Sequence, residues 1–356
     1  MGRAIKLRDL IGVVKDKASL SRAALLSTPN TLSLQLAVLR ATTHSASTAP
    51  AYKQLDSLLS LGDASRTTAS ALVQSLMDRL HRTGDSSVAL KCLFTIHYII
   101  KHGPFILQDQ LSIFPAAGGR NYLNLSAFRD GANPTTWALS AWVRWYARYL
   151  ENLLSTSRIL GIFLCSSSST AEKDKQEERL ASFMNVDLIR DAGSLVSLIE
   201  ELCDMPDSLL VEGNKLLHDV MGFACGDYLS AVNEVVSRLS EFRVRVNCLS
   251  FGESVELMKA LKRLENCKER LGLVFTVNKP STEALWGLVE ELKSGVGIVM
   301  ADGKAISLGR TEKGTESARF NGDRVLKNCE SVEFCSERFE LNKLSSMALE
   351  SAYYLS

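Results

Sequence analysis

The sequence predicts an all-α protein in which successive helices form an α-solenoid or extended bundle, followed by a mostly disordered C-terminal tail. Apolar residues make up 46% of the 356 residues, enough to bury a substantial core. They recur every three or four positions along most of the chain, which is the period of an amphipathic helix. No alternation of apolar and polar residues, the pattern of a half-buried strand, is convincing before residue 296. Helices that each bury one stripe must pack on their neighbours, and short loops between them favour a solenoid or bundle.

The first predicted helix, residues 5–17, is amphipathic and basic. Such a helix is either a membrane-surface element or a first helix that packs on the core with its basic face in water, and the pattern favours the second. The apolar stripe consists of Leu7, Leu10, Ile11 and Val14, and the basic residues away from it are Lys6, Lys15 and Lys17.

Five further helices are predicted as far as residue 153. Pro50 keeps the Ser- and Ala-rich stretch before it out of a helix, so a loop separates the first two. The fourth ends at His102, because the Gly-Pro pair that follows cannot continue it. Three tryptophans in the fifth are expected in the core rather than in a ligand platform. The five segments are 32–43, 53–61, 72–80, 88–100 and 137–153.

The second half is also predicted to be helical, as far as residue 293. A Ser run and a dense charged stretch at 166–179 mark a surface connection. From Gly295 the chain is rich in Gly, Ser and charge without helical period, so residues 296–356 are expected to be mostly disordered, with one short helix at 347–354. The helices before the tail are expected at 180–202 (interrupted around Gly193), 209–245, 250–273 and 281–293.

The charge distribution is polarised, although the net charge is only +1. Residues 1–53 carry eight basic and two acidic side chains, a net charge of +6, against −5 for the rest. Such a molecule can turn one end toward an anionic surface. The eight cysteines lack any C-x-x-C pair, and no apolar run approaches the roughly 20 residues that cross a bilayer. A cytosolic chain with reduced thiols is therefore expected.

Catalytic motifs are absent from the sequence, which contains no P-loop, G-x-S-x-G or H-E-x-x-H. His97 and His102 are five residues apart and face different sides of a helix, so they are not expected to hold a metal together. The sequence therefore predicts a binding protein, with no enzyme activity and no catalytic, cofactor or metal site.

The basic corner between the second and third predicted helices is the candidate ligand site. If one helix ends near His44 and the next begins near Lys53, then Arg40 and Lys53 converge and leave room for a phosphorylated headgroup. Arg engages a phosphate bidentately, and Lys adds a mobile point charge.

Four stretches of the sequence point to a known family. They are Arg-Ala-Thr-Thr-His at 40–44 with Pro50 and Lys53 after it, the block from Leu90-Lys91 to His97-Tyr98, the block from Leu123-Asn124 to Arg129-Asp130, and Trp-Val-Arg-Trp-Tyr-Ala-Arg-Tyr-Leu at 142–150. Together they resemble the ANTH domain of clathrin assembly proteins, especially the plant branch. The resemblance covers residues 1–155 and continues in helix pattern to about residue 293.

The resemblance implies an ENTH/ANTH-like membrane-binding solenoid at 1–155, a C-terminal helical part of the ANTH domain at 156–295 and a tail at 296–356. It implies an endocytic adaptor that binds membranes containing phosphatidylinositol 4,5-bisphosphate, helps clathrin coats assemble and vesicles bud, and sorts SNARE cargo. The implied location is cytoplasmic and peripheral to membranes, at clathrin-coated pits and vesicles, the plasma membrane and the Golgi apparatus. The implied headgroup ligands are Arg40, Lys53 and His44, with accessory membrane contacts from Lys6, Lys15 and Lys17.

The sequence departs from the family pattern in its headgroup motif and in its tail. Arg40 stands where the family has Lys, and residues 51–54 (Ala-Tyr-Lys-Gln) replace a short Lys cluster that is followed by His or Tyr. The tail lacks Asn-Pro-Phe, Asp-Pro-Phe and Asp-Leu-Leu, so membrane binding is better supported than clathrin recruitment. The alternative is a helical peptide-binding scaffold with no lipid binding. A nucleic-acid partner is not expected, because the basic region lacks interleaved aromatics.

Overall fold

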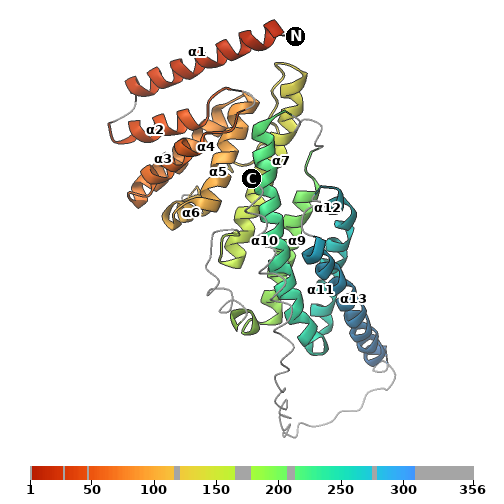
Figure 1. The fold of residues 1–356 in the computed structure, drawn as a ribbon. Coiled ribbons are helices and arrows are strands. Elements are labelled where there is room, and N and C mark those ends of the chain that lie inside the picture. Colours follow the sequence, from red (N-terminus) through yellow and green to blue (C-terminus); the bar gives the residue numbers. More distant parts are fainter. Residues whose placement is uncertain are drawn as a thin grey trace.

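The computed structural model describes residues 2–26, 29–45, 48–115, 121–164, 178–206, 213–274 and 279–308. The regular elements within these ranges are all helical, which confirms the predicted all-α fold (Figure 1). They are α1 (Gly2–Leu26), α2 (Pro29–Ala41), α3 (Tyr52–Gly62), α4 (Arg66–Arg82), α5 (Ser86–His102), α6 (Phe105–Ser112), α7 (Pro134–Leu160), α9 (Asn185–Cys203), α10 (Lys215–Arg245), the 3-10 turn η2 (Val246–Cys248), α11 (Phe251–Asn266), α12 (Lys268–Val274) and α13 (Lys279–Leu308).

Helix α5 is the centre of the N-terminal stack formed by α1 to α6. All of its residues from Ser86 to Ile100 are buried, because α2, α3, α4, α6, α7 and α10 pack around it. Asp85 caps its first turn by accepting bonds from two backbone N–H groups. Its end at His102 confirms the sequence prediction. A Cβ on the next residue, Gly103, would lie 2.4 Å from the carbonyl oxygen of Ile99, so glycine alone fits there.

The C-terminal helices form a bundle that α7 joins to the N-terminal stack. Helix α7 packs on α5 with one part of its surface and on α9 with another. Helix α13 lies against both α10 and α11, and α9 packs on α7, α10 and α11 (Figure 1). Trp142 and Trp145 of α7 are buried as predicted, whereas the prediction was wrong for Trp137, which is largely exposed.

A buried carboxylate connects the two halves of the chain. Asp227 of α10 is fully buried, and its two oxygens lie 2.7 Å from Nζ of Lys101 and 2.7 Å from Nε2 of His97, both on α5. Tyr149 of α7 donates its hydroxyl to the same carboxylate at 2.5 Å. His97 is completely enclosed, and its Nδ1 lies 2.9 Å from the hydroxyl oxygen of Tyr146. Three helices are therefore held together by one charged cluster.

Four details of the predicted helices were wrong. Helix α6 was not predicted, α9 runs through Gly193 without interruption, and the segment 250–273 is broken at Cys267 into α11 and α12. Helix α13 continues to Leu308, so the tail boundary expected at residues 295–296 lies inside a helix. Residues 309–356, with the short helix expected at 347–354, lie outside the described residues.

The described residues contain neither a candidate membrane span nor a candidate metal site. None of their helices is both long enough and apolar enough to cross a bilayer. Within the same ranges, no group of His, Cys, Asp and Glu side chains could hold a metal ion.

Candidate functional site

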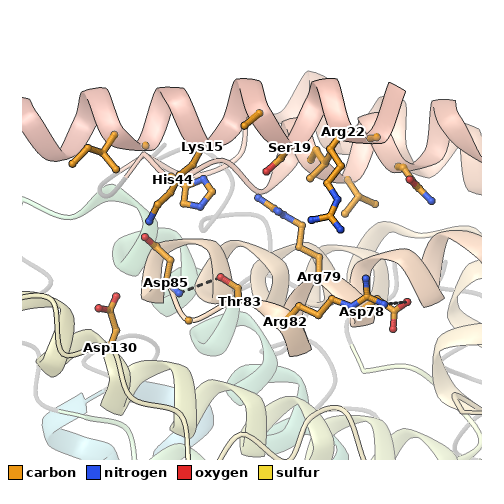
Figure 2. Close-up of a pocket in the computed structure, with 18 of the residues that line it drawn as sticks. Lys15, Ser19, Arg22, His44, Asp78, Arg79, Arg82, Thr83, Asp85 and Asp130 are labelled. Atoms are coloured by element: carbon orange, nitrogen blue, oxygen red, sulfur yellow. Dashed lines mark hydrogen bonds and ion pairs between the residues drawn. The ribbon is translucent and has the colours of Figure 1, made fainter. Parts of the chain in front are cut away.

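Helix α1 lies against α2 and over an open groove that separates it from α4 (Figure 2). The expectation that its apolar stripe packs on the core was wrong, because Leu10 and Val14 are 63% and 66% exposed. Among residues 10–25, the part of α1 whose side chains are described, the buried positions are the small residues Gly12 and Ala23. A Cβ on Gly12 would lie 3.1 Å from Cβ of His44, so glycine allows the close approach of α1 to the loop after α2. The helix therefore presents apolar side chains to the outside.

The loop that joins α2 to α3, residues 42–51, is anchored from α4. Thr42 is buried and donates its hydroxyl to the carbonyl oxygen of Val38 at 2.6 Å. The Arg79 guanidinium holds Thr42 twice, with Nε at 2.7 Å from the hydroxyl oxygen and Nη2 at 2.8 Å from the carbonyl oxygen. One arginine thus fixes the point where α2 ends.

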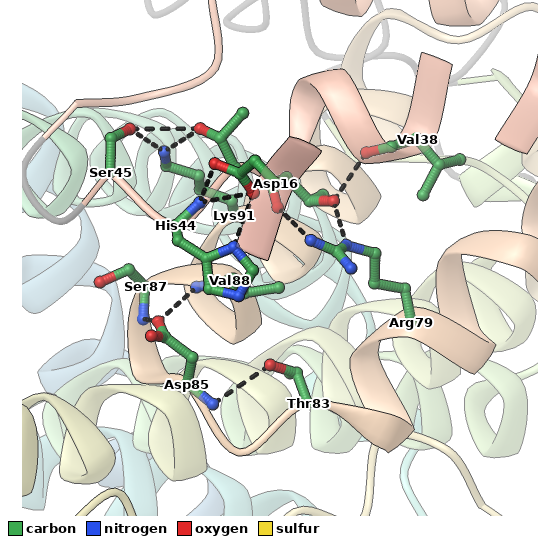
Figure 3. Close-up of polar contacts among 12 residues, drawn as sticks. Asp16, Val38, His44, Ser45, Arg79, Thr83, Asp85, Ser87, Val88 and Lys91 are labelled. Atoms are coloured by element: carbon green, nitrogen blue, oxygen red, sulfur yellow. Dashed lines mark hydrogen bonds and ion pairs between the residues drawn. The ribbon is translucent and has the colours of Figure 1, made fainter. Parts of the chain in front are cut away.

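His44 joins the same loop to α1 (Figure 3). Its Nδ1 lies 2.6 Å from Oδ1 of Asp16, and its backbone N–H donates to both carboxylate oxygens, at 3.1 Å to the nearer one. The His44 side chain is only 12% exposed. Its contacts therefore point into the molecule, and the headgroup role expected for it stays a prediction.

A buried lysine supports the loop from below. Lys91 of α5 donates its ammonium to the hydroxyls of Thr43, at 2.9 Å, and Ser45, at 2.7 Å (Figure 3). Burial lowers the pKa of Lys91 to about 8, although the carboxylates of Asp16 and Asp85 act in the opposite direction. Residues 42–45 of the loop are thus held by polar contacts from α1, α4 and α5.

The two basic residues predicted to hold a headgroup lie at the ends of this loop. Arg40 is in the last turn of α2, and Lys53 is the second residue of α3. Both side chains are exposed, and within the described ranges neither forms an ion pair. Ala51 places no side-chain cap on α3, so the first turn of that helix still presents backbone N–H groups and the positive end of its dipole. The convergence of Arg40 and Lys53 on one ligand stays a prediction.

The lysines of α1 that were expected to make accessory membrane contacts do not share one surface. Lys15 and Lys17 are both exposed, but two residues apart on a helix they point to opposite sides. Lys15 lines the groove, together with Ser19 and Arg22, whereas Lys17 does not (Figure 2). The side chain of Lys6 lies outside the described residues.

Sequence reasoning missed the residues that organise the site. Arg79, Lys91 and Asp16 make its defining contacts, yet each looks like an ordinary polar position on an amphipathic helix. The only available signal was the short Thr-Thr-His motif, whose polar side chains need partners once they are held near a core.

These features define an all-α solenoid domain, in which three helices brace the loop between α2 and α3 and the first helix exposes apolar side chains. Comparison with known sequences specifies the family: the ANTH domain model matches residues 33–272. The chain therefore belongs to the ANTH-domain family of clathrin assembly proteins.

Three similar proteins, all from Arabidopsis thaliana, are named putative clathrin assembly proteins. At4g40080 is 50% identical over 349 residues, which cover 95% of this chain and 96% of that protein. At5g65370 is 30% identical over 299 residues, with 81% and 99% covered. At5g10410 is 31% identical over 294 residues, with 80% and 84% covered.

Proposed function

We propose that this protein is a clathrin adaptor that binds phosphoinositide headgroups at the surface of membranes. The observation that carries the proposal is the state of the loop between α2 and α3. Residues 42–45 of that loop are held by Arg79, Lys91 and Asp16, while Arg40 and Lys53 at its ends remain exposed. A braced loop with cations at both ends is organised before any ligand arrives, which reduces the entropy lost on binding.

A phosphate fits the chemistry of this corner. Arg40 supplies a planar guanidinium, and Lys53 supplies an ammonium in the first turn of α3. The backbone N–H groups of that turn and its helix dipole also favour an anion. A headgroup with two phosphates could engage both side chains at once.

Charge alone gives weak binding. Basic residues near an anionic membrane contribute about 1 kcal/mol each, so Arg40, Lys53 and Lys17 together reach an affinity of only about millimolar. The outward side of α1 adds apolar contact, because Leu10, Val14 and Leu25 are 63%, 66% and 84% exposed. Full burial of a Leu or Val side chain is worth about 1.5–3 kcal/mol, so partial insertion of three of them strengthens binding considerably.

Liposome co-sedimentation of the full chain tests the headgroup site. Vesicles with and without phosphatidylinositol 4,5-bisphosphate are compared for the wild type and for Arg40→Glu combined with Lys53→Glu. The matched control is Lys215→Glu combined with Lys262→Glu, which makes the same charge change at exposed positions of α10 and α11. The proposal expects binding that depends on the headgroup and is lost only in the first double variant.

A second pair of substitutions tests the first helix. Leu10→Ser combined with Val14→Ser removes apolar surface but no charge, and should weaken sedimentation of the wild-type chain without changing its preference for the phosphorylated lipid. If no form of the protein sediments with either vesicle, the helical peptide-binding scaffold without lipid binding takes the place of the membrane adaptor.

The partners and locations follow from the same proposal. The names of the relatives describe clathrin assembly, and we extend that role to this chain together with SNARE sorting at coated pits, the plasma membrane and the Golgi apparatus. Co-sedimentation of the full chain with assembled clathrin cages tests the first part. Absence of the protein from the cage pellet would remove clathrin from its direct partners.

A further inference from the structure

Two cysteines that are far apart in the sequence meet in the C-terminal bundle. Cys203 is the last residue of α9, and Cys267 lies at the break between α11 and α12. Both are free thiols, although 64 positions separate them along the chain. Sγ of Cys203 lies 4.0 Å from the carbonyl oxygen of Cys267, and the Cys203 thiol donates a hydrogen bond to the sulfur of Cys267. The two sulfurs are therefore close enough to react with one another.

Contacts on both sides of Cys267 hold this pair together. Helix α9 packs on α11 and on α12. Arg270 of α12 donates Nε to the carbonyl oxygen of Cys203 at 3.2 Å. Arg263 of α11 donates Nε to the Glu200 carboxylate of α9 at 2.9 Å. The end of α9 is thus fixed against both helices that flank Cys267, so the two thiols are brought together by the tertiary structure.

Both cysteines stand at helix ends, where the backbone adjusts more easily. A disulfide holds its sulfurs about 2.05 Å apart, which is closer than two hydrogen-bonded thiols, so the pair must move together when it is oxidised. Residues inside a helix are held by the hydrogen bonds of the backbone, whereas terminal residues shift at low cost. Cys203 and Cys267 can therefore approach each other without the unwinding of a helix.

The surroundings of the two thiols favour different roles for them. The hydrogen bond from Cys203 and the charge of Arg263 hold the pKa of Cys267 below its ordinary value, although burial acts in the opposite direction. The same hydrogen bond, together with burial, raises the pKa of Cys203. Cys267 is therefore the thiol that ionises first and acts as the nucleophile. Cys203 is only half-buried, so a small oxidant reaches the pair from its side.

We infer that Cys203 and Cys267 are a redox modification site, at which a hydroperoxide converts the two thiols into a reversible disulfide. The Cys267 thiolate attacks the terminal peroxide oxygen and the O–O bond breaks, which leaves a sulfenic acid on Cys267. The second oxygen takes up the proton that Cys267 released and departs as water or an alcohol. The sulfur of Cys203 then attacks the sulfur of Cys267, the S–O bond breaks, and hydroxide leaves with the Cys203 proton as water. The sulfurs lose two electrons, and the peroxide gains them.

The disulfide closes a loop of chain that contains the whole of α10 and α11, which lie between the two cysteines. It ties the end of α9 to the start of α12, so it opposes opening of the C-terminal bundle. A loop of this length should raise the thermal unfolding midpoint by roughly 5–10 °C. A small dithiol reverses the change by thiol–disulfide exchange.

Peptide mapping by mass spectrometry tests this site in the full chain. The protein is treated with stoichiometric hydrogen peroxide, alkylated without reduction and digested, and a second sample is reduced with dithiothreitol before alkylation. The expected result is a cross-linked pair of peptides that contain Cys203 and Cys267, together with a higher thermal midpoint, and both changes should revert with dithiothreitol. The matched control is Cys248→Ser, which removes an exposed thiol and should form the same cross-link.

Two further variants test the roles of the two thiols. In Cys203→Ser, Cys267 has no partner thiol, so its sulfenic acid should persist and react with dimedone. In Cys267→Ser, the cross-link and the rise in the thermal midpoint should both be lost, and circular dichroism of the reduced variants checks that they fold. The mapping of the wild-type chain does not depend on either variant. The inference is overturned if both thiols can still be alkylated after peroxide, if Cys267 pairs with a cysteine other than Cys203, or if peroxide raises the midpoint of Cys267→Ser as much as that of the wild type.

Discussion

Replacement of Asp227 by asparagine should destabilise the whole helical domain. Asp227→Asn keeps the size of the side chain but removes its charge, which lies 2.7 Å from Nζ of Lys101. The Lys101 side chain is only 10% exposed, so water replaces the lost carboxylate poorly. Breaking a buried ion pair on one side costs about 3–5 kcal/mol. That is a large fraction of the roughly 5–15 kcal/mol that stabilises a native protein.

Urea and thermal unfolding, followed by far-ultraviolet circular dichroism, measure this cost. About 4 kcal/mol corresponds to a decrease in melting temperature of roughly 10 °C for a domain of this size. The control is Asp219→Asn on the same helix, whose carboxylate lies 3.8 Å from His218 near the surface and should lose less than about 1 kcal/mol. Equal stability of the two variants would refute the role assigned to the buried cluster.

The difference in stability between the wild type and Asp227→Asn should also depend on pH. Burial alone raises the pKa of Asp227, but the Lys101 ammonium and the hydrogen bonds from His97 and Lys101 outweigh burial and hold the pKa below its ordinary value. A carboxylate with a lower pKa in the folded state stabilises the fold above its unfolded pKa, which is about 4, and loses that contribution as the pH falls further. The difference between wild type and Asp227→Asn should therefore stay constant from about pH 7 to pH 5 and shrink below about pH 4. A difference that persists unchanged in acid would contradict this reasoning.

Three smaller predictions concern α1 and α11. Asp16→Ala removes the carboxylate that accepts hydrogen bonds from the backbone N–H and the imidazole of His44. The free energy of local opening of α1, measured by hydrogen exchange, should therefore fall by about 1–3 kcal/mol, while α10 stays protected. Gly12→Val forces a side chain against His44 and should accelerate exchange in α1 as well, and unchanged exchange would show that α1 is not held at this point. Ser250→Ala removes the hydroxyl that accepts the N–H of Glu253 in a capping box, and should cost about 1 kcal/mol in urea unfolding. A normal denaturation midpoint would argue against that cap.

Periodicity was a reliable guide where packing and local preference agree. The helix that ends at His102 was predicted because a Gly-Pro stop signal and an apolar stripe coincide there. The continuation of α13 to Leu308 was missed because Gly295 and its neighbours have poor intrinsic helix preference. Gly295 lies against Val246, so contact with η2 contributes what local sequence does not. Gly193 of α9 has open space around it, and the helix continues through it because the rest of α9 packs on α7, α10 and α11.

In the candidate site, too, local sequence patterns indicate some residues and only folding brings the others together. Arg40 and Lys53 were proposed from the sequence, because the basic motif and the loop between them are contiguous in the chain, and their role stays a prediction. The contacts that brace this loop come from Asp16, Arg79 and Lys91, which are far from it in sequence. Only folding makes them neighbours, so no local pattern marks them. For the same reason the sequence suggested that Leu10 and Val14 face the core, when the structure exposes them.

The amino-acid sequence by itself determined the helical class, most helix positions and the family, because these depend on short-range periodicity, capping and linear motifs. The tertiary structure decided which polar residues are partners, which face of α1 is covered and where a groove opens between α1 and α4. Those outcomes depend on burial, which removes water from some charges and leaves others exposed. The energy of a charged side chain is set by that environment, and the environment is built from residues that are distant in the sequence.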